Sequence, residues 1–229
     1  MPRDVGVVIV AAGQGRRLGG PPKQFRPIAG VPMVLRALRP FAAHPEVAHV
    51  VLVLPPADAA APPRFLAEVA GAGLTLVAGG AERSDSVAAG LAALPPACRT
   101  VLVHDGVRPF PDPAVIDAVI REARSGRGAV AAVPMTDTVK EIDAADGRRV
   151  VRTVPRDTLW RAQTPQGFPR ELLARAHQRA RAEDRHGTDD AALVEGLGVE
   201  VRVVPDSPGN RKITTPEDLE WAEHWATRR

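Results

Sequence analysis

A loop rich in glycine and basic residues follows the first apolar run of the chain. Gly13 and Gly15 leave backbone N–H groups open to an anion, as in a nest. Arg16, Arg17 and Lys23 add positive charge around them. A nucleoside triphosphate carries far more charge than one backbone nest neutralises, so several basic groups in one loop favour that ligand. A solvated basic surface loop is the competing interpretation.

The spacing of this loop disfavours two familiar phosphate-binding sites. Leu18 stands where the dinucleotide fingerprint requires its third glycine. The second predicted strand ends in Leu54-Pro55-Pro56, without the acidic residue that would grip a ribose. A Walker A loop needs a Gly-Lys-Ser/Thr sequence, which does not follow. An NAD-dependent oxidoreductase is therefore disfavoured.

Lysine is rare in this chain. Only three of the 30 basic residues are lysines, at positions 23, 140 and 212. Because arginine serves wherever a generic positive charge suffices, a retained lysine indicates a position that needs a compact ammonium group. Chance retention is the alternative for any single lysine, but all three lie inside motif-like stretches.

The elements that must position these residues alternate between strand and helix. Apolar runs predict strands at Val5–Val10, Val47–Leu54, Leu74–Ala78, Thr100–His104 and Ala129–Val133. Helical spacing and start signals predict helices at Met33–Ala43, Pro62–Ala70, Glu82–Leu94 and Pro113–Arg124. The alternation predicts an α/β fold, a Rossmann-like, doubly wound and mostly parallel sheet with helices on both faces.

Three chemically rich segments fall at the carboxyl ends of the predicted strands. They are the glycine loop, the Gly79-Gly80 turn and the pair His104-Asp105. Ligands of doubly wound sheets bind beyond these ends. The sequence therefore predicts one binding site at this edge of the sheet.

The pattern changes between Pro134 and Pro169. Two short strands around an Asp146-Gly147 turn and a segment at Trp160 lack the apolar content of a core element. We expect residues 135–160 to form a projecting β-hairpin arm on a single domain of residues 1–229. Exposed hairpins often pair with another chain, so the arm predicts an interface with a second chain.

The C-terminal part returns to the alternating pattern. We expect a helix near Arg170–Arg181, a helix capped by Thr188, a strand at Val199–Val204 and a final helix begun by Thr215. Asp189 and Asp190 are predicted in the first turn of their helix. His177, His186 and His224 show no metal-ligand spacing and are interpreted as surface residues.

Composition narrows the class of protein. A net charge of +3, 3% aromatic residues and the absence of tyrosine argue against a nucleic-acid partner. No apolar run reaches the roughly 18 residues that span a bilayer, so no membrane partner is expected. The N-terminus shows no signal-peptide pattern, and the single Cys98 excludes an internal disulfide framework. These features favour a cytoplasmic enzyme.

An ordered set of short motifs resembles a known family. The set reads Ala11-Ala12-Gly13-x-Gly15-x-Arg17-x-Gly19, Pro22-Lys23-Gln24, Gly79-Gly80-x-x-Arg83-x-x-Ser86-Val87, Val103-His104-Asp105-Gly106-Val107-Arg108-Pro109, Asp137-Thr138-Val139-Lys140, Thr153-x-x-Arg156-x-x-Leu159-Trp160-x-Ala162-Gln163-Thr164-Pro165-Gln166, Thr188-Asp189-Asp190 and Asn210-x-Lys212-Ile213-Thr214. Together these motifs resemble the 2-C-methyl-D-erythritol 4-phosphate cytidylyltransferases, and they span the chain. Val107 and Ala81 depart from that pattern, where the family commonly has a smaller residue and, in some members, an acidic one.

The resemblance implies a reaction and a set of binding residues. A phosphomonoester oxygen attacks the α-phosphorus of CTP and expels pyrophosphate, with Mg²⁺ or another divalent cation held mainly by the CTP phosphates and Asp105 as a candidate ligand. By resemblance the catalytic residues are Arg17, Lys23, Arg156 and Lys212. The CTP-binding residues are Ala11, Ala12, Gly13, Gly15, Gly80, Ser86 and Asp105. The polyol-phosphate-binding residues are Asp105, Arg108, Thr138, Arg156, Thr164 and Lys212.

The family resemblance also implies a homodimer with shared sites, in which Arg156 serves the site of a second subunit. Two of the implied residues have structural alternatives. Ser86 can satisfy backbone groups at a helix start, and Asp105 can close an Asx turn on Arg108. At the level of function, the alternatives are a cytidylyltransferase for another polyol phosphate, such as ribitol 5-phosphate, and a non-catalytic nucleotide-binding protein.

Overall fold

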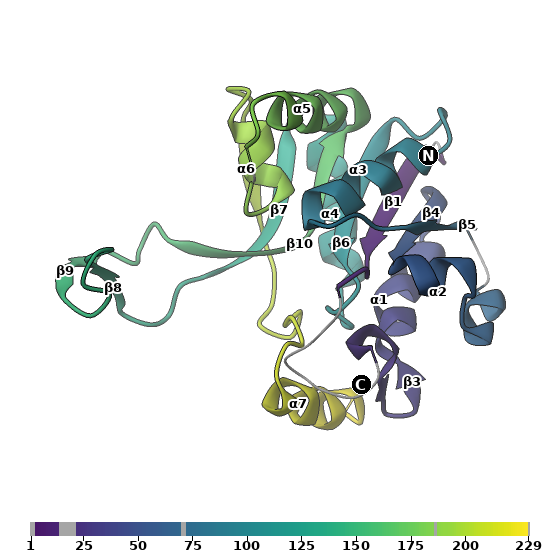
Figure 1. Ribbon diagram of the computed structural model, residues 1–229, viewed down its shortest axis with the longest axis horizontal. Helices are drawn as coiled ribbons and strands as arrows, with labels where there is room; N and C mark the ends of the chain where they lie inside the picture. Colours follow the sequence, from purple (N-terminus) through teal and green to yellow (C-terminus); the bar gives the residue numbers. More distant parts are fainter. Residues whose placement is uncertain (1–2, 14–21, 70–71, 186, 229) are drawn as a thin grey trace.

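A seven-stranded sheet forms the centre of the molecule in the computed structural model, which describes residues 3–13, 22–69, 72–185 and 187–228. The strand order is β11 (Val201–Pro205), β7 (Gly128–Pro134), β10 (Trp160–Pro169), β6 (Thr100–Asp105), β1 (Val5–Val10), β4 (Val47–Leu54) and β5 (Gly73–Ala78). Only β10 runs antiparallel to its neighbours in this sheet. The predicted α/β class with a mostly parallel sheet is confirmed (Figure 1).

Helices cover both faces of the sheet. The apolar sides of α1 (Met33–Ala42) and α4 (Pro113–Arg124) pack on one face, in a core that includes Ile9 and Leu102. The apolar sides of α3 (Arg83–Ala93), α5 (Arg170–Ala182) and α6 (Asp190–Glu195) pack on the other. Strands buried on both faces read as continuous apolar runs, which is why the sequence located them correctly.

Two predicted helices differ from the structure. The expected helix at Pro62–Ala70 is replaced by α2 (Pro56–Ala60) and a 3₁₀ turn, η3 (Arg64–Glu68). Pro55 and Pro56 stand at the start of α2, and Pro62 and Pro63 precede η3. Because proline favours helix starts and blocks helix interiors, two short pieces form. Helix α6 is capped by Asp189 rather than Thr188, since the Asp189 carboxylate accepts a hydrogen bond from the backbone N–H of Ala192 at 2.9 Å.

Strand β10 corrects the interpretation of residues 134–169 as lacking any core element. Its second half, Gln163–Phe168, is buried between β6 and β7. Polar side chains at 163, 164 and 166 hid this strand from a hydrophobic pattern, and each of them is hydrogen-bonded within the protein. Buried polar side chains are stable where such partners exist.

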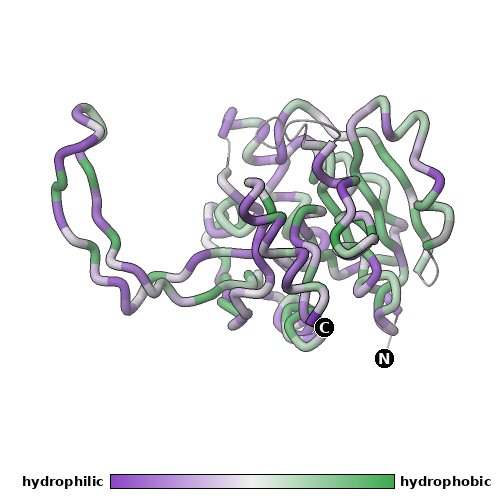
Figure 2. The backbone as a smooth tube through the Cα atoms, turned by 90° about the horizontal axis from the view of Figure 1, so that it is seen from below, coloured by the Kyte–Doolittle hydropathy of each residue, from purple (hydrophilic) through white to green (hydrophobic). Residues whose placement is uncertain are grey.

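The arm itself is present. Strands β8 (Val139–Ile142) and β9 (Val150–Val154) form a separate antiparallel pair that extends away from the sheet and its helices in both views (Figures 1 and 2). Ile142, Val150 and Val151 on this arm are 50%, 53% and 55% exposed. The arm therefore presents apolar side chains to solvent.

A third, smaller core lies below the sheet. The hairpin β2 (Pro27–Ile28) and β3 (Val31–Pro32) contacts α7 (Pro216–Ala226), and Ile28, Phe110 and Ile213 are buried between them. Helix α7 begins after Thr215, as predicted, and Thr215 and Asp218 form a capping box there. Within the described part of the chain, no helix combines the length and the apolar content that a membrane crossing needs.

Candidate active site

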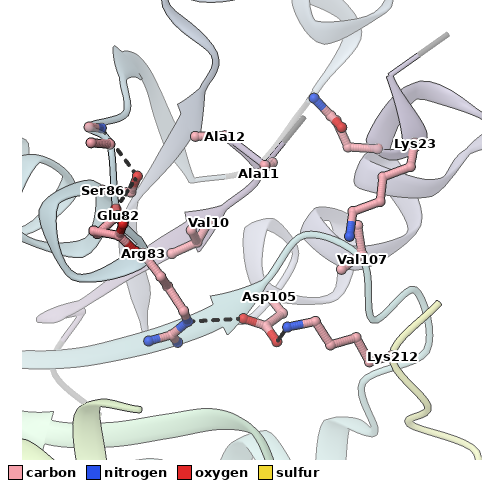
Figure 3. Close-up of a pocket in the computed structure, with 14 residues that line it drawn as sticks. Val10, Ala11, Ala12, Lys23, Glu82, Arg83, Ser86, Asp105, Val107 and Lys212 are labelled. Atoms are coloured by element: carbon pink, nitrogen blue, oxygen red, sulfur yellow. Dashed lines mark hydrogen bonds and ion pairs between the residues drawn. The ribbon is translucent and has the colours of Figure 1, made fainter. Parts of the chain in front are cut away.

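Three loops meet at the carboxyl edge of the sheet and enclose a cavity of about 190 Å³ (Figure 3). The register explains the meeting, because Val10 at the end of β1 lies opposite Asp105 at the end of β6. The lining comprises Val10, Ala11, Ala12, Gly13, Lys23, Gln24, Gly80, Ala81, Glu82, Arg83, Ser86, Asp105, Val107 and Lys212. The predicted binding edge is thus a concave site.

The Gly79-Gly80 turn forms one wall of this cavity. A Cβ atom on Gly79 would lie 2.4 Å from the Cβ of Ala12, so only glycine lets the two loops approach this closely. The Ser86 hydroxyl accepts a hydrogen bond from the Gly80 N–H and donates to the Glu82 carbonyl, both at 3.2 Å. Ser86 therefore shapes the turn through backbone groups, as the structural alternative for this residue anticipated.

Asp105 is the most heavily paired carboxylate at the site. Its side chain is 9% exposed and lies 3.0 Å from the Lys212 ammonium, 3.4 Å from Arg83 Nε and 3.5 Å from Arg108 Nε. Burial by itself would raise the pKa of Asp105, but Lys212, Arg83 and Arg108 outweigh it and hold that pKa well below its usual range. Asp105 is therefore ionised at neutral pH.

The loop that carries Lys212 is fixed on both sides of that residue. Ile213 is fully buried, and its N–H donates to the Val107 carbonyl at 2.9 Å. The Asn210 amide donates to the Thr164 carbonyl and to Asp206 Oδ2, both at 2.6 Å. The Asn210 backbone carbonyl accepts from Arg108 at 2.9 Å. These contacts bring a residue from near the C-terminus to the end of β6.

Beneath Asp105, a buried histidine links β6 to β10. His104 Nδ1 lies 2.9 Å from the Thr164 hydroxyl, and its Nε2 lies 3.0 Å from the Arg108 carbonyl. Burial lowers the pKa of His104 to about 4, so the ring is neutral and donates from Nε2. The Thr164 hydroxyl also accepts from the Asp105 N–H at 3.0 Å. Thr164 therefore orients the end of β6 as well as lining the site.

A second cavity of about 240 Å³ adjoins the first. It shares Arg83, Asp105 and Lys212 with the first cavity. Its other lining residues are Arg108, Ala162, Gln163, Thr164, Gln166, Thr188 and Asp189. Strand β10 and the segment before α6 thus extend the site away from β1.

Most of the predicted site residues that the structure describes lie at these two cavities. The first is lined by Ala11, Ala12, Gly13, Lys23, Gly80, Ser86, Asp105 and Lys212, and the second also by Arg108 and Thr164. Thr138 and Arg156 lie exposed on the arm, where Arg156 donates to the Thr136 carbonyl. Gly15, Arg16 and Arg17 fall outside the described residues.

Arg83 is a site residue to which the sequence assigned no role. Its guanidinium lies 2.8 Å from Asp190 Oδ2 as well as near Asp105, and it lines both cavities. The interpretation of His177 as a surface residue was wrong, because His177 is 9% exposed and its Nε2 lies 2.9 Å from Asp190. Helix periodicity alone could have flagged His177, which follows the buried positions Leu173 and Ala176.

The two departures from the family pattern have simple surroundings. Val107 is 6% exposed and packs in the third core, so its side chain fills apolar space beside the first cavity. Ala81 lines the same cavity without offering a polar side chain. Among the described residues no group of three or more His, Cys, Asp or Glu side chains could hold a metal ion.

Nearly the whole sequence matches a family model. The model of the 2-C-methyl-D-erythritol 4-phosphate cytidylyltransferases (IspD) matches residues 5–228. A curated relative of that name from Salinibacter ruber is 47% identical over 217 residues, which cover 94% of this chain and 89% of the relative.

Solved structures agree with this match. The crystal structure of 2-C-methyl-D-erythritol 4-phosphate cytidylyltransferase from Thermus thermophilus superposes with a TM-score of 0.80 at 36% identity, covering 98% of this chain and 99% of that one. The 4-diphosphocytidyl-2C-methyl-D-erythritol synthase from Anaerococcus prevotii gives a TM-score of 0.85 at 30% identity, with 98% of each chain covered.

Proposed function

Because the chain belongs to the family of 2-C-methyl-D-erythritol 4-phosphate cytidylyltransferases, we propose that it transfers the cytidylyl group of CTP to 2-C-methyl-D-erythritol 4-phosphate. The products are 4-diphosphocytidyl-2-C-methyl-D-erythritol, an isoprenoid precursor of the non-mevalonate route, and pyrophosphate. The enzyme is a nucleotidyltransferase.

One observation carries this proposal beyond the family match. Lys23 and Lys212, two of the three lysines, line the same cavity, and Lys23 lies on the side of it opposite Ser86 in the close-up (Figure 3). They reach it from opposite ends of the chain. Two ammonium groups at the carboxyl edge of a doubly wound sheet suit a phosphorylated nucleotide and a second phosphorylated substrate.

The reaction needs alignment and charge neutralisation rather than a covalent nucleophile. An oxygen of the polyol phosphate attacks the α-phosphorus of CTP, and the bond to the bridging oxygen of the β-phosphate breaks. Negative charge grows on the α-phosphoryl oxygens in the transition state. Lys23 is assigned to that charge, together with Arg17, whose position lies outside the described residues.

The CTP base and ribose are assigned to the wall formed by β1 and the Gly79-Gly80 turn. The backbone of Ala11, Ala12 and Gly80 and the region around Ser86 line the cavity there. Backbone donors and acceptors at fixed positions can distinguish cytosine from other bases by hydrogen bonding. Gly13 lines the same cavity and is assigned to the phosphates, together with Gly15, which lies outside the described residues.

The site suits Mg²⁺, or another divalent cation, that takes most of its ligands from the substrate phosphates. The carboxylate of Asp105 is the one acidic side chain common to both cavities among the described residues. Mg²⁺ commonly binds through one or two carboxylates plus phosphate oxygens and water. When bound, the cation would neutralise charge on the phosphates.

The polyol phosphate is assigned to the second cavity and to the arm of another subunit. Arg108, Thr164 and Lys212 are available within one chain. The exposed Ile142, Val150 and Val151 support a homodimer formed through the arm at residues 135–160. In such a dimer Thr138 and Arg156 of one chain would complete the site of the other. Neither a nucleic acid nor a membrane is a proposed partner, and a cytoplasmic location stays a prediction.

A substrate assay tests the proposed function. The protein is incubated with CTP and Mg²⁺ and with either 2-C-methyl-D-erythritol 4-phosphate or ribitol 5-phosphate, and pyrophosphate release is measured. We expect turnover with the methylerythritol phosphate and little with the ribitol phosphate. Equal or faster turnover of ribitol 5-phosphate would assign the chain to another polyol, and no turnover of either would favour a non-catalytic nucleotide-binding protein.

A further inference from the structure

The two cavities share lining residues that form an ion pair. Arg83, Asp105 and Lys212 are the residues that line both cavities. Within this shared wall the Lys212 ammonium lies 3.0 Å from Asp105 Oδ2, as the close-up shows (Figure 3). The proposed reaction needs a phosphate oxygen from the second cavity to reach a phosphorus atom in the first. The contact between Lys212 and Asp105 therefore lies at the place where the two substrates must come together.

Asp105 has more cationic partners than one carboxylate needs. Arg83 and Arg108 lie 3.4 Å and 3.5 Å from its two oxygens, and their side chains are only 29% and 11% exposed. Arg83 is also held at 2.8 Å by the buried carboxylate of Asp190. Because both arginines are anchored, the Asp105 carboxylate keeps two compensating charges if Lys212 leaves.

Lys212 is the most exposed member of this group. Its side chain is 41% exposed, far more than those of Asp105 and Arg108. Its backbone is fixed by the buried Asn210 and Ile213. A lysine stem of four carbons with three rotatable donors can swing about such a fixed backbone, whereas an arginine fork is committed to its planar geometry.

We propose that Lys212 exchanges partners during the reaction cycle: it leaves Asp105 to bind the phosphate of the incoming polyol phosphate. The exchange opens the wall between the two cavities. It also frees one Asp105 oxygen to accept a hydrogen bond from a polyol hydroxyl. Phosphate binding and hydroxyl recognition are thereby coupled through one ion pair. This inference rests on the proposed function, because it takes a phosphorylated polyol as the incoming ligand.

The scarcity of lysine makes the exchange directly measurable. With three lysines in the chain, lysine labelled with ¹⁵N at the side chain gives three ammonium signals by NMR. A Lys212→Arg variant assigns the Lys212 signal. We expect that signal to move when saturating 2-C-methyl-D-erythritol 4-phosphate is added without CTP, a condition that allows no turnover. A Lys212 signal unchanged at saturation would overturn the proposal without any variant at position 105.

A variant of Asp105 tests the partner that is lost. In the free protein, Asp105→Asn should move the Lys212 signal away from its wild-type position. With saturating polyol phosphate, the Lys212 signals of wild type and Asp105→Asn should converge, because Lys212 then contacts phosphate in both. A difference that persists undiminished in the bound state would show that Lys212 keeps Asp105, and would refute the exchange.

A matched control separates pairing from general electrostatics. Asp189 lines the second cavity but is not paired with Lys212. Asp189→Asn removes one negative charge there, and asparagine remains a good helix cap. We expect inorganic phosphate to bind Asp105→Asn about fivefold more tightly than wild type, a factor typical of releasing a partly exposed ion pair. Asp189→Asn should change this affinity by less than about twofold. Equal effects of the two substitutions would count against the exchange.

The outcome can be separated from that of the proposed function. If the wild-type protein forms product from CTP but its Lys212 signal does not move when the polyol phosphate is added, only the exchange is refuted. A protein that binds the polyol phosphate with the expected convergence but forms no product refutes the proposed reaction instead.

Discussion

Lys23 and Lys140 carry the same charge in very different surroundings. Lys23 lines the first cavity, whereas Lys140 lies exposed on the arm and donates to the Thr153 hydroxyl at 2.8 Å. Lysine scarcity singled out both residues equally. Only their positions in the fold separate a candidate phosphate-binding group from an arm contact.

Replacing these two lysines tests that separation. We expect Lys23→Ala to lower kcat by about 10²- to 10³-fold, because one donor to transition-state charge is lost in a concave site. Lys140→Ala should leave kcat within about twofold. Steady-state kinetics with CTP and circular dichroism on both variants provide the measurement. Retained activity in a folded Lys23→Ala protein would remove Lys23 from the mechanism.

His104 should make stability depend on pH. Burial lowers its pKa to about 4 in the folded protein from an ordinary value of 6.5. Protons therefore bind the unfolded chain first as the pH falls. The contribution of the neutral His104 to the free energy of unfolding is therefore complete above about pH 6.5. As the pH falls to 4, that free energy decreases by roughly 3 kcal/mol.

Urea unfolding at several pH values measures this contribution. A His104→Gln variant should be less stable at pH 7 and should lose less stability than wild type between pH 6.5 and 4. The exposed His224 supplies the control, because a His224→Gln variant should keep the wild-type slope. An unchanged slope in His104→Gln would show that other groups dominate acid unfolding.

At the scale of elements, β10 departs most from what the sequence indicated. Its buried half reads Gln-Thr-Pro-Gln-Gly-Phe and carries no alternation of apolar side chains. The Gln166 amide is satisfied by Asp189 at 2.7 Å and by the Ala191 N–H at 3.0 Å. These partners come from a segment more than twenty residues away, so no local sequence pattern could predict this strand.

Packing around β10 can be tested at Gly167. A Cβ atom there would lie 2.5 Å from Val119 Cγ1 and 2.9 Å from Leu102 Cδ2, both in the core. We expect Gly167→Ala to lower the free energy of unfolding by about 1–3 kcal/mol through overpacking. Gly196→Ala is the control, since its added carbon would have no neighbour nearer than 3.3 Å. Equal stability of the two variants in urea would refute the close packing.

At the scale of the whole molecule, the arm explains why one chain does not assemble every predicted residue. Thr138 and Arg156 are exposed on the arm, while Lys23 and Lys212 line the cavity. In the views of Figures 1 and 2 the arm extends away from the body of its own chain. The proposed site, completed by a partner subunit, would reconcile these positions with the roles implied by the family resemblance.

Mixed dimers test this arrangement. Arg156→Ala and Lys23→Ala subunits should each be nearly inactive alone. When they are mixed and allowed to exchange, the hybrid dimer carries one site with both wild-type residues, so activity should return to at most half that of wild type per hybrid dimer. Sedimentation of both variants checks that they dimerise. Absence of recovery in a confirmed hybrid would favour a site built within one chain.

The sequence by itself determined the fold class, the order of the main elements and the edge of the sheet that carries the site. These features follow from local periodicity, helix start signals and the position of short motifs at strand ends. All of these signals depend on residues that are close together in the sequence. The tertiary structure alone placed Lys212 against Asp105, Arg83 between two carboxylates and β10 within the sheet. Those contacts join residues from about twenty to more than a hundred positions apart, and their energy exists only after the chain has folded.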